Sequence, residues 1–328
     1  MLDIPGGLRE RFTYKAGQFL TFRIPVAGQP LLRCYSMSSS PDTDPEMKVT
    51  IKRIAGGRVS NWINDNVREG EILQASAPAG RFCLRDRGIP IVAFSGGSGI
   101  TPVISIIKTA LATTSRRIRL LYANRDEDSI IFARELAELS RRHPARLQIA
   151  HHLDRTDGFI GAAALDRFIC GNEQSDFYIC GPEPFMDLVE KALANGNIDR
   201  DGIFIERFIS LPDNSVQPLF DQAGAARAAT AVEEVVFIIR RTRHRVPYRA
   251  GDTLLETARR AALRPPASCE SGNCGACVAR LKAGRAAMRV NNVLTPAEVA
   301  DGYVLTCQGR PTAAGTIVDY DWRCRQRP

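Results

Sequence analysis

The sequence predicts three domains: an antiparallel β-barrel, a doubly wound α/β domain with a parallel sheet, and a small α+β domain. Its 328 residues amount to roughly twice the length of a typical domain, so two or three domains are expected. Short alternating strands broken by turns fill residues 17–83, whereas continuous apolar strands alternate with helices from residue 89 onward. We therefore place the domains at residues 1–87, 88–210 and 232–328, with a linker at 211–231.

The barrel is predicted from two short alternating runs, Gln18–Ile24 and Lys48–Ile54. Gly56-Gly57 and Pro78-Ala79-Gly80 interrupt the pattern, as turns do between strands. This spacing is typical of a small antiparallel barrel.

The α/β domain begins where the pattern changes, at the continuous apolar strand Ile89–Ser95. A glycine-rich turn, Gly96–Gly99, and a helical stretch, Pro102–Ala112, follow this strand. Further strands and helices alternate at Ile118–Ala123, Ser129–Arg142, Leu147–His152, Asp176–Cys180, Glu183–Asn195 and Ile203–Phe208. Buried-type strands that alternate with helices predict a parallel, doubly wound sheet.

The predicted linker is rich in Pro, Gly and Ala and shows little periodicity, which is typical of interdomain segments. Beyond it, Val235–Arg241 is predicted as a strand and Asp252–Ala262 as a helix. A cysteine-rich loop follows, and these elements make up the predicted α+β domain.

The net charge of +8 is concentrated in the last domain. Residues 232–328 hold 16 Lys/Arg against 9 Asp/Glu, a balance of +7, whereas residues 1–231 hold 28 against 27, a balance of +1. A basic domain can bind nucleic acid, but no Lys/Arg run or interleaved aromatic platform accompanies this charge. We therefore expect an acidic protein partner and no nucleic acid.

No uninterrupted apolar stretch approaches the roughly 18 residues that span a bilayer, so no membrane span is expected. Residues 1–11 lack the basic start and apolar middle of a signal peptide. We expect a soluble, cytoplasmic protein, in which the nine cysteines do not form a disulfide framework.

Four cysteines, Cys269-x4-Cys274-x2-Cys277-x29-Cys307, have the spacing of a plant-type ferredoxin [2Fe–2S] cluster. In this arrangement three thiolates from one tight loop bind one side of the cluster, and the fourth arrives from a distant strand. The sequence therefore predicts these four residues as the metal ligands.

The glycines of this loop support the cluster over two alternatives. Gly272 and Gly275 let the backbone turn closely around the sulfides and direct N–H groups at them. A structural zinc site usually needs paired C-x2-C motifs, and only one short pair exists here. A thioredoxin-type redox pair at Cys274 and Cys277 would need a strand–helix context, which is absent. Cys324 lies outside the pattern and is interpreted as a bystander thiol.

A second group of motifs lies upstream, in the order Arg33-Cys34-Tyr35-Ser36, Gly57-Arg58-Val59-Ser60 and the turn at Gly96–Gly99. This order resembles the ferredoxin–NADP reductase superfamily, in the branch with a C-terminal plant-type ferredoxin domain. The matching segments are RCYSMSSSP (33–41), GGRVSNW (56–62), GGSGITP (96–102), YANRD (122–126), CGPEPFM (180–186), ERF (206–208) and CESGNCGAC (269–277).

The members of this branch are reductase components of multicomponent oxygenases, including Rieske systems. Residues 291–311 look especially like reductases that serve ketosteroid hydroxylases. The resemblance implies that the barrel binds FAD, that the parallel-sheet domain binds NAD(P) and that residues 232–328 form a β-grasp-type ferredoxin domain. The family's barrel normally begins with an additional strand before the segment that corresponds to Leu2–Arg23. We therefore expect either a truncated start or another element that closes the barrel edge.

The resemblance implies that three residues of one barrel strand contact FAD. Arg33 would pair with its phosphates, which suits a guanidinium fork. Tyr35 would pack on the isoalloxazine, and the Ser36 hydroxyl would hydrogen-bond near flavin N5, where hydride arrives. The other implied flavin contacts are backbone amides at the pyrophosphate and residues beside the ring: Gly57, Val59, Ser60, Thr101 and Phe208. Each of these residues could instead be structural.

The predicted pyridine-nucleotide site lies at the carboxyl ends of the parallel strands. Gly97-Ser98-Gly99 follows a strand and opens a helix, so its amides can meet a pyrophosphate. Cys180-Gly181-Pro182 ends a later strand at the same edge. The resemblance implies that Cys180 lies near the nicotinamide and helps to position hydride transfer, and that Glu206 matches a carboxylate that some relatives use there.

The nucleotide preference is predicted from the segment after the second sheet strand. Asn124 and Arg125 are expected near the adenosine ribose. Arg125 could serve the 2′-phosphate of NADPH, but Asp126, Glu127 and Asp128 follow and would repel it. NADH is therefore the expected donor, with NADPH possible.

Together the motifs predict a reductase that passes electrons from NADH through FAD and [2Fe–2S] to a Rieske-type oxygenase with an acidic docking patch. One alternative is a reductase for a di-iron oxygenase, epoxidase or desaturase. Another is a non-enzymatic iron–sulfur carrier with a degenerate flavin module, which the intact RCYS and CGP motifs disfavour.

Overall fold

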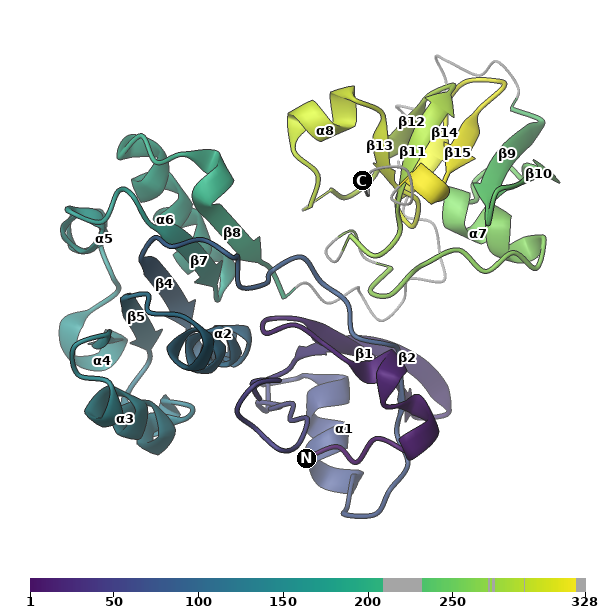
Figure 1. Ribbon diagram of the computed structural model, residues 1–328. Helices are drawn as coiled ribbons and strands as arrows, with labels where there is room; N and C mark the ends of the chain where they lie inside the picture. Colours follow the sequence, from purple (N-terminus) through teal and green to yellow (C-terminus); the bar gives the residue numbers. More distant parts are fainter. Residues whose placement is uncertain (209–231, 271, 273–274, 292, 323–328) are drawn as a thin grey trace. The chain divides into compact units, whose positions relative to one another are not determined.

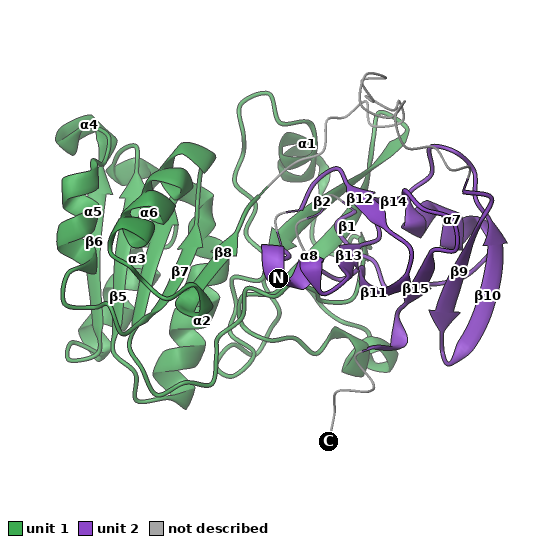
Figure 2. Ribbon diagram, turned by 90° about the horizontal axis from the view of Figure 1, so that it is seen from above, with its two compact units in different colours: residues 1–208 green, residues 209–328 purple. Residues whose placement is uncertain are grey.

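The computed structural model describes residues 1–208, 232–270, 272, 275–291 and 293–322. The chain divides into two compact units, Met1–Phe208 (unit 1) and Ile209–Pro328 (unit 2), coloured separately in Figure 2. The predicted linker, 211–231, lies outside the described residues. None of the described helices is long and apolar enough to cross a membrane.

The first part of unit 1 is antiparallel (Figure 1). After two short 3-10 helices, η1 (Gly6–Leu8) and η2 (Glu10–Phe12), β1 (Phe19–Val26) pairs with β2 (Gln29–Ser36) over its whole length. The short β3 (Gln74–Ala75) pairs with the other edge of β1. The core consists of buried side chains from β1, the loops and a helix: Leu20, Phe22, Ile24, Val26, Met37, Met47, Val59 and Ile63.

Two expectations for this part are wrong. Lys48–Ile54 is not a strand; it joins the sheet through the isolated bridge between Met37 and Val49. The turn predicted at Gly56-Gly57 is present at Ala55-Gly56, but it leads into helix α1 (Arg58–Asn66) and not into a strand. Val59 and Ile63 lie on one face of α1 and are buried, so packing in the core of the antiparallel part stabilises a helix that the alternating pattern did not indicate.

The second part of unit 1 is a five-stranded parallel sheet in the order β6-β5-β4-β7-β8. The strands are β4 (Ile91–Gly96), β5 (Ile118–Asn124), β6 (Leu147–Leu153), β7 (Asp176–Cys180) and β8 (Ile203–Glu206). The chain builds outward in one direction from β4 to β6 and then returns to the other side of β4 at β7. This topological switch point lies between β4 and β7, where ligands bind in open parallel sheets.

Helices cover both faces of this sheet, which confirms the doubly wound fold. One face packs against α2 (Ile100–Thr113) and α3 (Ala133–Arg142). The other packs against α5 (Ala162–Ile169) and α6 (Glu183–Asn195), and the short α4 (Asp154–Asp157) follows β6. Helix α2 is buried without a break from Ile100 to Leu111, because it packs on the sheet and also meets the antiparallel part.

The described residues of unit 2 form a mixed sheet in the order β10-β9-β15-β11-β13, and among these strands only β15 and β9 are parallel. Its strands are β9 (Glu234–Ile239), β10 (Thr242–Pro247), β11 (Val278–Ala283), β13 (Tyr303–Leu305) and β15 (Ile317–Asp319). A separate pair joins β12 (Ala286–Met288) to β14 (Gly309–Pro311), and the short α8 is Pro296–Ala300.

One helix, α7 (Leu254–Arg260), packs Leu254 and Ala258 into the core of unit 2. It is shorter than the predicted Asp252–Ala262. Thr253 caps its start by accepting a hydrogen bond from the Glu256 N–H, and Ala262 adopts a positive φ of 56° beyond its end. A mixed sheet with one packed helix confirms the predicted α+β domain.

Candidate functional site

The end of β2 holds a buried hydroxyl without a partner in the described part of the chain. Ser36 is 3% exposed, and its Oγ makes no hydrogen bond there. Buried polar atoms in proteins are nearly always hydrogen-bonded. This hydroxyl therefore indicates a polar group that the chain itself does not supply, as the predicted contact with flavin N5 requires.

Arg33 and Tyr35 lie on the opposite face of β2 from Ser36, because side chains alternate along a strand. Burial raises the pKa of the Tyr35 phenol to about 12, and its ring centroid lies 6.0 Å from that of Phe22. The Arg33 Nη1 donates a hydrogen bond to the Leu32 carbonyl at 2.9 Å. A guanidinium has five N–H donors, so this bond is compatible with the predicted phosphate contact.

Helix α1 begins directly after Gly57, and the first N–H groups of any helix lack acceptors within it. Val59 is 2% exposed in the core, and Ser60 Oγ accepts a hydrogen bond from the Ile54 N–H at 3.3 Å. The side chains of Val59 and Ser60 are thus used structurally. Their backbone amides, at the positive end of the helix dipole, are the groups that suit the predicted FAD pyrophosphate.

The loops after β4 and β7 pack against each other at the switch point. A Cβ on Gly99 would lie 2.0 Å from the Cys180 carbonyl oxygen, and a Cβ on Gly96 would lie 2.6 Å from Cδ of Pro182. A Cβ on Gly181 would lie 2.9 Å from the Gly96 nitrogen. Glycine is therefore needed for the approach of one loop to the other, a reason that the sequence did not reveal.

Two hydrogen bonds fix the Gly97-Ser98-Gly99 turn. The Tyr122 hydroxyl donates to the Gly97 carbonyl at 2.9 Å, and Thr101 Oγ1 donates to the Ser98 carbonyl at 3.1 Å. Thr101 is only 3% exposed, so its hydroxyl supports the turn. Its predicted position beside the flavin ring stays a prediction.

Lys52 is a candidate binding residue that sequence reasoning missed. Its Nζ lies 3.6 Å from the position that a Cβ would take on Gly97, so an exposed ammonium group faces the glycine turn. A cation beside a phosphate-binding turn strengthens anion binding. Residues 48–54 were interpreted only as a predicted strand, and this pattern contained no signal of what Lys52 faces.

Cys180 and Glu206 are neighbours in the parallel ladder between β7 and β8. The Cys180 side chain is fully buried in the core of the sheet, and burial, followed by the nearby Glu206 carboxylate, raises the pKa of its thiol well above the usual value. The thiol is therefore neutral at pH 7. Contact with a nicotinamide would require movement of the residues around it. Phe208, predicted to cover the flavin, is 42% exposed.

Asn124 ends β5 with a buried amide. It is 4% exposed, and neither side-chain amide atom makes a hydrogen bond of normal geometry within the described chain. Burial raises the pKa of the nearby Tyr122 phenol to about 12, although the Ile131 N–H and the Asn124 amide act in the opposite direction. An amide with unused hydrogen-bonding capacity at the carboxyl edge suits a nucleotide contact.

Arg125, next in the chain, is exposed and paired. Its Nε lies 3.2 Å from the Asp126 carboxylate, and Nη2 of Arg155 lies 3.5 Å from the same group. Asp126 is fixed in turn, because its side chain accepts a hydrogen bond from the Ser129 N–H at 3.0 Å. This carboxylate therefore competes with any phosphate for the Arg125 guanidinium.

In unit 2, three of the four predicted cluster ligands are described and buried. Cys269, Cys277 and Cys307 are each at most 6% exposed, whereas Cys274 lies outside the described residues. A hydrogen bond with Cys307 holds the pKa of the Cys277 thiol below its usual range, so these two thiols are in contact. No group of three or more His, Cys, Asp or Glu within the described residues is arranged to hold a metal ion, and that set does not include the fourth cysteine.

The backbone of the cysteine loop has the geometry that the sequence predicted. Gly272 and Gly275 have positive φ angles of 82° and 67°. A Cβ on Gly272 would lie 2.8 Å from the Val290 carbonyl oxygen, and Gln308 Nε2 donates to the Glu270 carbonyl at 2.7 Å. A tight loop with thiol donors, which are soft ligands, fits an iron–sulfur cluster.

Three segments of the chain match known domain families. Residues 6–83 match the oxidoreductase FAD-binding domain, residues 94–191 the oxidoreductase NAD-binding domain, and residues 237–312 the 2Fe-2S iron-sulfur cluster binding domain.

Relatives match over nearly the whole chain. The ferredoxin reductase component of 3-ketosteroid-9-alpha-monooxygenase from Rhodococcus rhodochrous is 39% identical over 97% of this chain and 91% of its own length. One component of the 1,2-phenylacetyl-CoA epoxidase from Escherichia coli K12 is 32% identical over 97% of this chain and 92% of its own. Among solved structures, phthalate dioxygenase reductase is described as a modular structure for electron transfer from pyridine nucleotides to [2Fe-2S]. It is 29% identical to this chain, with a TM-score of 0.57, and the match covers 93% of this chain and 88% of that chain.

These matches agree with the antiparallel part, the parallel sheet and the cysteine loop of the fold. The chain therefore belongs to the reductase components of oxygenases, oxidoreductases that join an FAD-binding domain, an NAD-binding domain and a C-terminal 2Fe-2S ferredoxin domain.

Proposed function

We propose that this reductase takes electrons from NADH and delivers them to a Rieske-type oxygenase, of the kind that hydroxylates ketosteroids or related substrates. The unpaired Ser36 hydroxyl, which lies in the same unit as the glycine-lined switch point, supports the flavin site. The similarity to the R. rhodochrous reductase component supports the choice of oxygenase. FAD, when bound, supplies the chemistry that converts a two-electron hydride donor into one-electron transfer. We propose residues 1–87 as the FAD-binding domain, 88–210 as the NAD-binding domain and 232–328 as the ferredoxin domain.

In this proposal the chain holds FAD through β2 and α1. Ser36 donates its hydroxyl hydrogen toward flavin N5, and Tyr35 packs on the isoalloxazine. The N-terminal amides of α1 and the guanidinium of Arg33 bind the phosphates. FMN has no second phosphate for the α1 amides, so acid-released cofactor that runs as FMN would contradict this assignment.

The nicotinamide nucleotide is held at the switch point. The Gly97-Ser98-Gly99 turn and the Lys52 ammonium face its pyrophosphate, while Cys180 and Glu206 help to position the nicotinamide. Because the Cys180 thiol is neutral, its proposed role is not that of a nucleophile. We propose that it orients the ring by contact once the residues that bury it move. Anaerobic NADH should bleach the bound flavin within one turnover, and an unreduced flavin would refute the proposal.

NADH is the proposed donor because Asp126 occupies the Arg125 guanidinium at 3.2 Å. A 2′-phosphate near Arg125 would also meet the negative charges of Glu127 and Asp128. We expect a higher kcat/KM for NADH than for NADPH. Replacing Asp126 with Asn should narrow this ratio, whereas Glu173→Gln, on an exposed residue in the segment between α5 and β7, should leave it unchanged.

A second candidate partner is a di-iron oxygenase. The E. coli relative, a component of a phenylacetyl-CoA epoxidase, favours this alternative, whereas the more similar relative from R. rhodochrous serves a 3-ketosteroid monooxygenase. NADH-driven product formation with one purified oxygenase of each type decides between them. Faster turnover with the di-iron enzyme would reverse our choice.

We propose that the partner oxygenase has an acidic surface, and that this surface docks on the basic unit 2. The Lys, Arg, Asp and Glu side chains of residues 232–328 sum to +7. An oxidised cluster with four thiolates carries about −2, so the domain stays basic when the cluster is bound. Two cations belong to the cluster region: Arg259 pairs with Glu270 at 2.7 Å, and Arg289 contacts Gln308 at 3.4 Å. Complementary charge accelerates association and is weakened by salt. The cytoplasmic location stays a prediction.

A further inference from the structure

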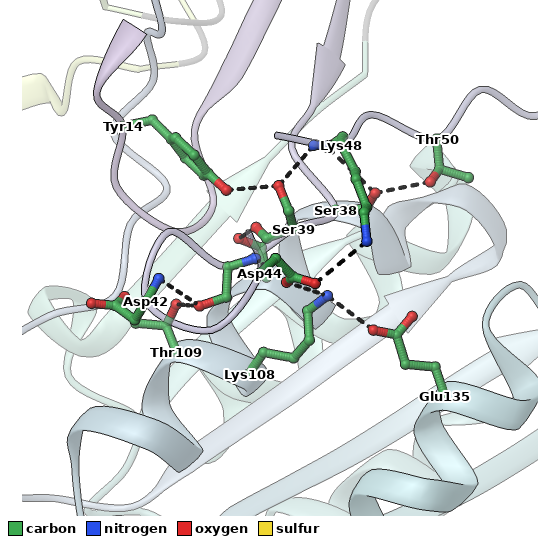
Figure 3. A network of polar contacts seen from close by, with 12 residues as sticks. Tyr14, Ser38, Ser39, Asp42, Asp44, Lys48, Thr50, Lys108, Thr109 and Glu135 are labelled. Carbon is green, nitrogen blue, oxygen red and sulfur yellow. Dashed lines mark hydrogen bonds and ion pairs between the residues drawn. The ribbon is translucent and has the colours of Figure 1, made fainter. Parts of the chain in front are cut away.

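The two parts of unit 1 meet at a buried ion pair (Figure 3). Lys108 on α2 has a side chain that is only 8% exposed. Its Nζ lies 2.8 Å from Oδ2 of Asp44 and 2.9 Å from Oε1 of Glu135. Asp44 belongs to the loop after β2, and Glu135 belongs to α3. One ammonium group therefore joins a carboxylate of the flavin-binding part to a carboxylate of the nucleotide-binding part.

Two hydrogen bonds extend this contact along the same face of α2. Ser105 Oγ donates to the Ser39 carbonyl at 2.6 Å, and the hydroxyls of Ser40 and Thr109 lie 2.7 Å apart. Ser105, Lys108 and Thr109 have the spacing i, i+3 and i+4, which places them on one helix face. This face of α2 is a polar seam against residues 39–44.

The seam connects the two proposed cofactor sites through short, ordered segments. Lys108 lies roughly 12 Å along α2 from the glycine turn at its start. On the other side, the loop that carries Asp44 follows the strand that ends at Ser36, and Asp44 Oδ2 accepts a hydrogen bond from the Ser40 N–H at 2.7 Å. A shift of Asp44 relative to Lys108 would therefore change the separation between Ser36 and the glycine turn.

The charges in the seam are balanced. Lys48 adds a second cation, 3.7 Å from Oδ1 of Asp44, so two carboxylates face two ammonium groups. A buried ion pair contributes little net stability in place of apolar packing, but it can select one arrangement of its surroundings. The position of this pair points to alignment of the two parts and not to stability alone.

We propose that Lys108 is a positioning residue for hydride transfer, which acts by holding Asp44 and so fixes the flavin site relative to the nicotinamide site. The inference rests on the proposed function. Lys108 touches neither proposed cofactor site, so it acts only through the geometry that it maintains.

The test compares two variants that each remove one carboxylate from the same ammonium group. Asp44→Asn removes the carboxylate of the ion pair that crosses between the parts and keeps an oxygen for the Ser40 N–H. Glu135→Gln removes a partner within the nucleotide-binding part. Flavin reduction by saturating NADH is followed anaerobically by stopped flow. We expect Asp44→Asn to slow it about tenfold, since a misplacement of about 1 Å can cost up to about 100-fold. The KM for NADH and the FAD content of Asp44→Asn should stay at wild-type values. The rate of flavin reduction in Glu135→Gln should also equal that of the wild type.

A kinetic isotope effect and a rescue separate alignment from general damage. With NADH deuterated at C4, the isotope effect on flavin reduction should become more temperature-dependent in Asp44→Asn. Lys108→Arg should keep the wild-type rate of flavin reduction, and Lys108→Met should slow it as Asp44→Asn does. If Asp44→Asn does not fold, the two Lys108 variants test the proposal in its place. Equal rates for Asp44→Asn and Glu135→Gln, or slowing explained by lost FAD, would overturn the inference. An unreduced wild-type flavin would instead refute the proposed function.

Discussion

Units 1 and 2 build their sites from different parts of the chain. In unit 1 the proposed sites depend mainly on backbone, namely glycines that let two loops meet and the start of α1, together with one buried hydroxyl. In unit 2 the predicted cluster site depends on side chains, because cysteine thiolates would supply the bonds to iron. Electron transfer through unit 1 should therefore be most sensitive to substitutions that add atoms. Electron transfer through unit 2 should be most sensitive to substitutions that remove a ligand atom.

The largest effect is expected from Cys307→Ser in unit 2. Loss of one thiolate should remove the cluster and with it nearly all NADH-driven reduction of cytochrome c, while the flavin is still reduced by NADH at the wild-type rate. Iron content, absorbance and stopped flow measure the three quantities. Cys170→Ser, at an exposed cysteine, is the control and should change none of them. A Cys307→Ser protein with a full cluster would show that the ligand set is wrong.

Gly99→Ala tests the backbone site of unit 1. The φ of Gly99 is −60°, which any residue adopts, so only the 2.0 Å approach to the Cys180 carbonyl opposes the added methyl group. We expect a loss of unfolding free energy of about 1–3 kcal/mol and a slower flavin reduction by NADH. Thermal denaturation and stopped flow measure both. The control is Gly88→Ala, where no atom lies within 4 Å; equal behaviour of the two variants would contradict the crowding argument.

Ser36→Ala removes the unpaired hydroxyl. Loss of one hydrogen bond of about 1 kcal/mol should slow flavin reduction about fivefold. The melting temperature of the flavin-free protein should not fall, because the hydroxyl has no partner in the described chain. Ser175→Ala is a matched control, since the Ser175 hydroxyl is also buried and unpaired within the described chain. Ser175 precedes the amino end of β7, whereas the proposed nucleotide site lies at the carboxyl ends of the strands. A loss of rate in both variants would argue against a specific flavin contact.

The smallest effect concerns the charges of unit 2. Arg289 contacts Gln308 beside Cys307, whereas Arg243 lies on β10, at the edge of the sheet opposite to β13. Arg289→Gln should slow electron transfer to the oxygenase about threefold at low salt, and the difference should vanish at high salt as the Debye length shortens. Arg243→Gln should have less effect. A rate that is independent of salt in the wild type would discard electrostatic docking.

The difference between the units also explains what could be predicted from the sequence. The four cysteines have a fixed spacing, so the site of unit 2 is visible in the chain itself. The strand–helix alternation predicted the parallel sheet, and β7 and α6 have the expected bounds. In contrast, α1 depends on packing of Val59 and Ile63 in the core of the antiparallel part, and the run Lys48–Ile54 alternates without forming a ladder.

Contacts between distant segments were the least predictable. Lys52 faces Gly97, and Lys108 contacts Asp44, across separations that no local pattern encodes. Likewise, Gly99, whose turn was predicted to direct amides at a pyrophosphate, also makes room for the Cys180 carbonyl. The fold class follows from periodicity, whereas such pairings depend on how the elements pack.

The central claim is that electrons enter at unit 1 and leave through unit 2. Mixing the whole protein with NADH under anaerobic conditions, while flavin and cluster absorbance are recorded separately, tests it most directly. We predict that flavin absorbance falls first and cluster absorbance follows, and that in Cys307→Ser only the flavin change remains, at an unaltered rate. Cluster reduction without prior flavin reduction, or a flavin that NADH leaves oxidised, would contradict the account.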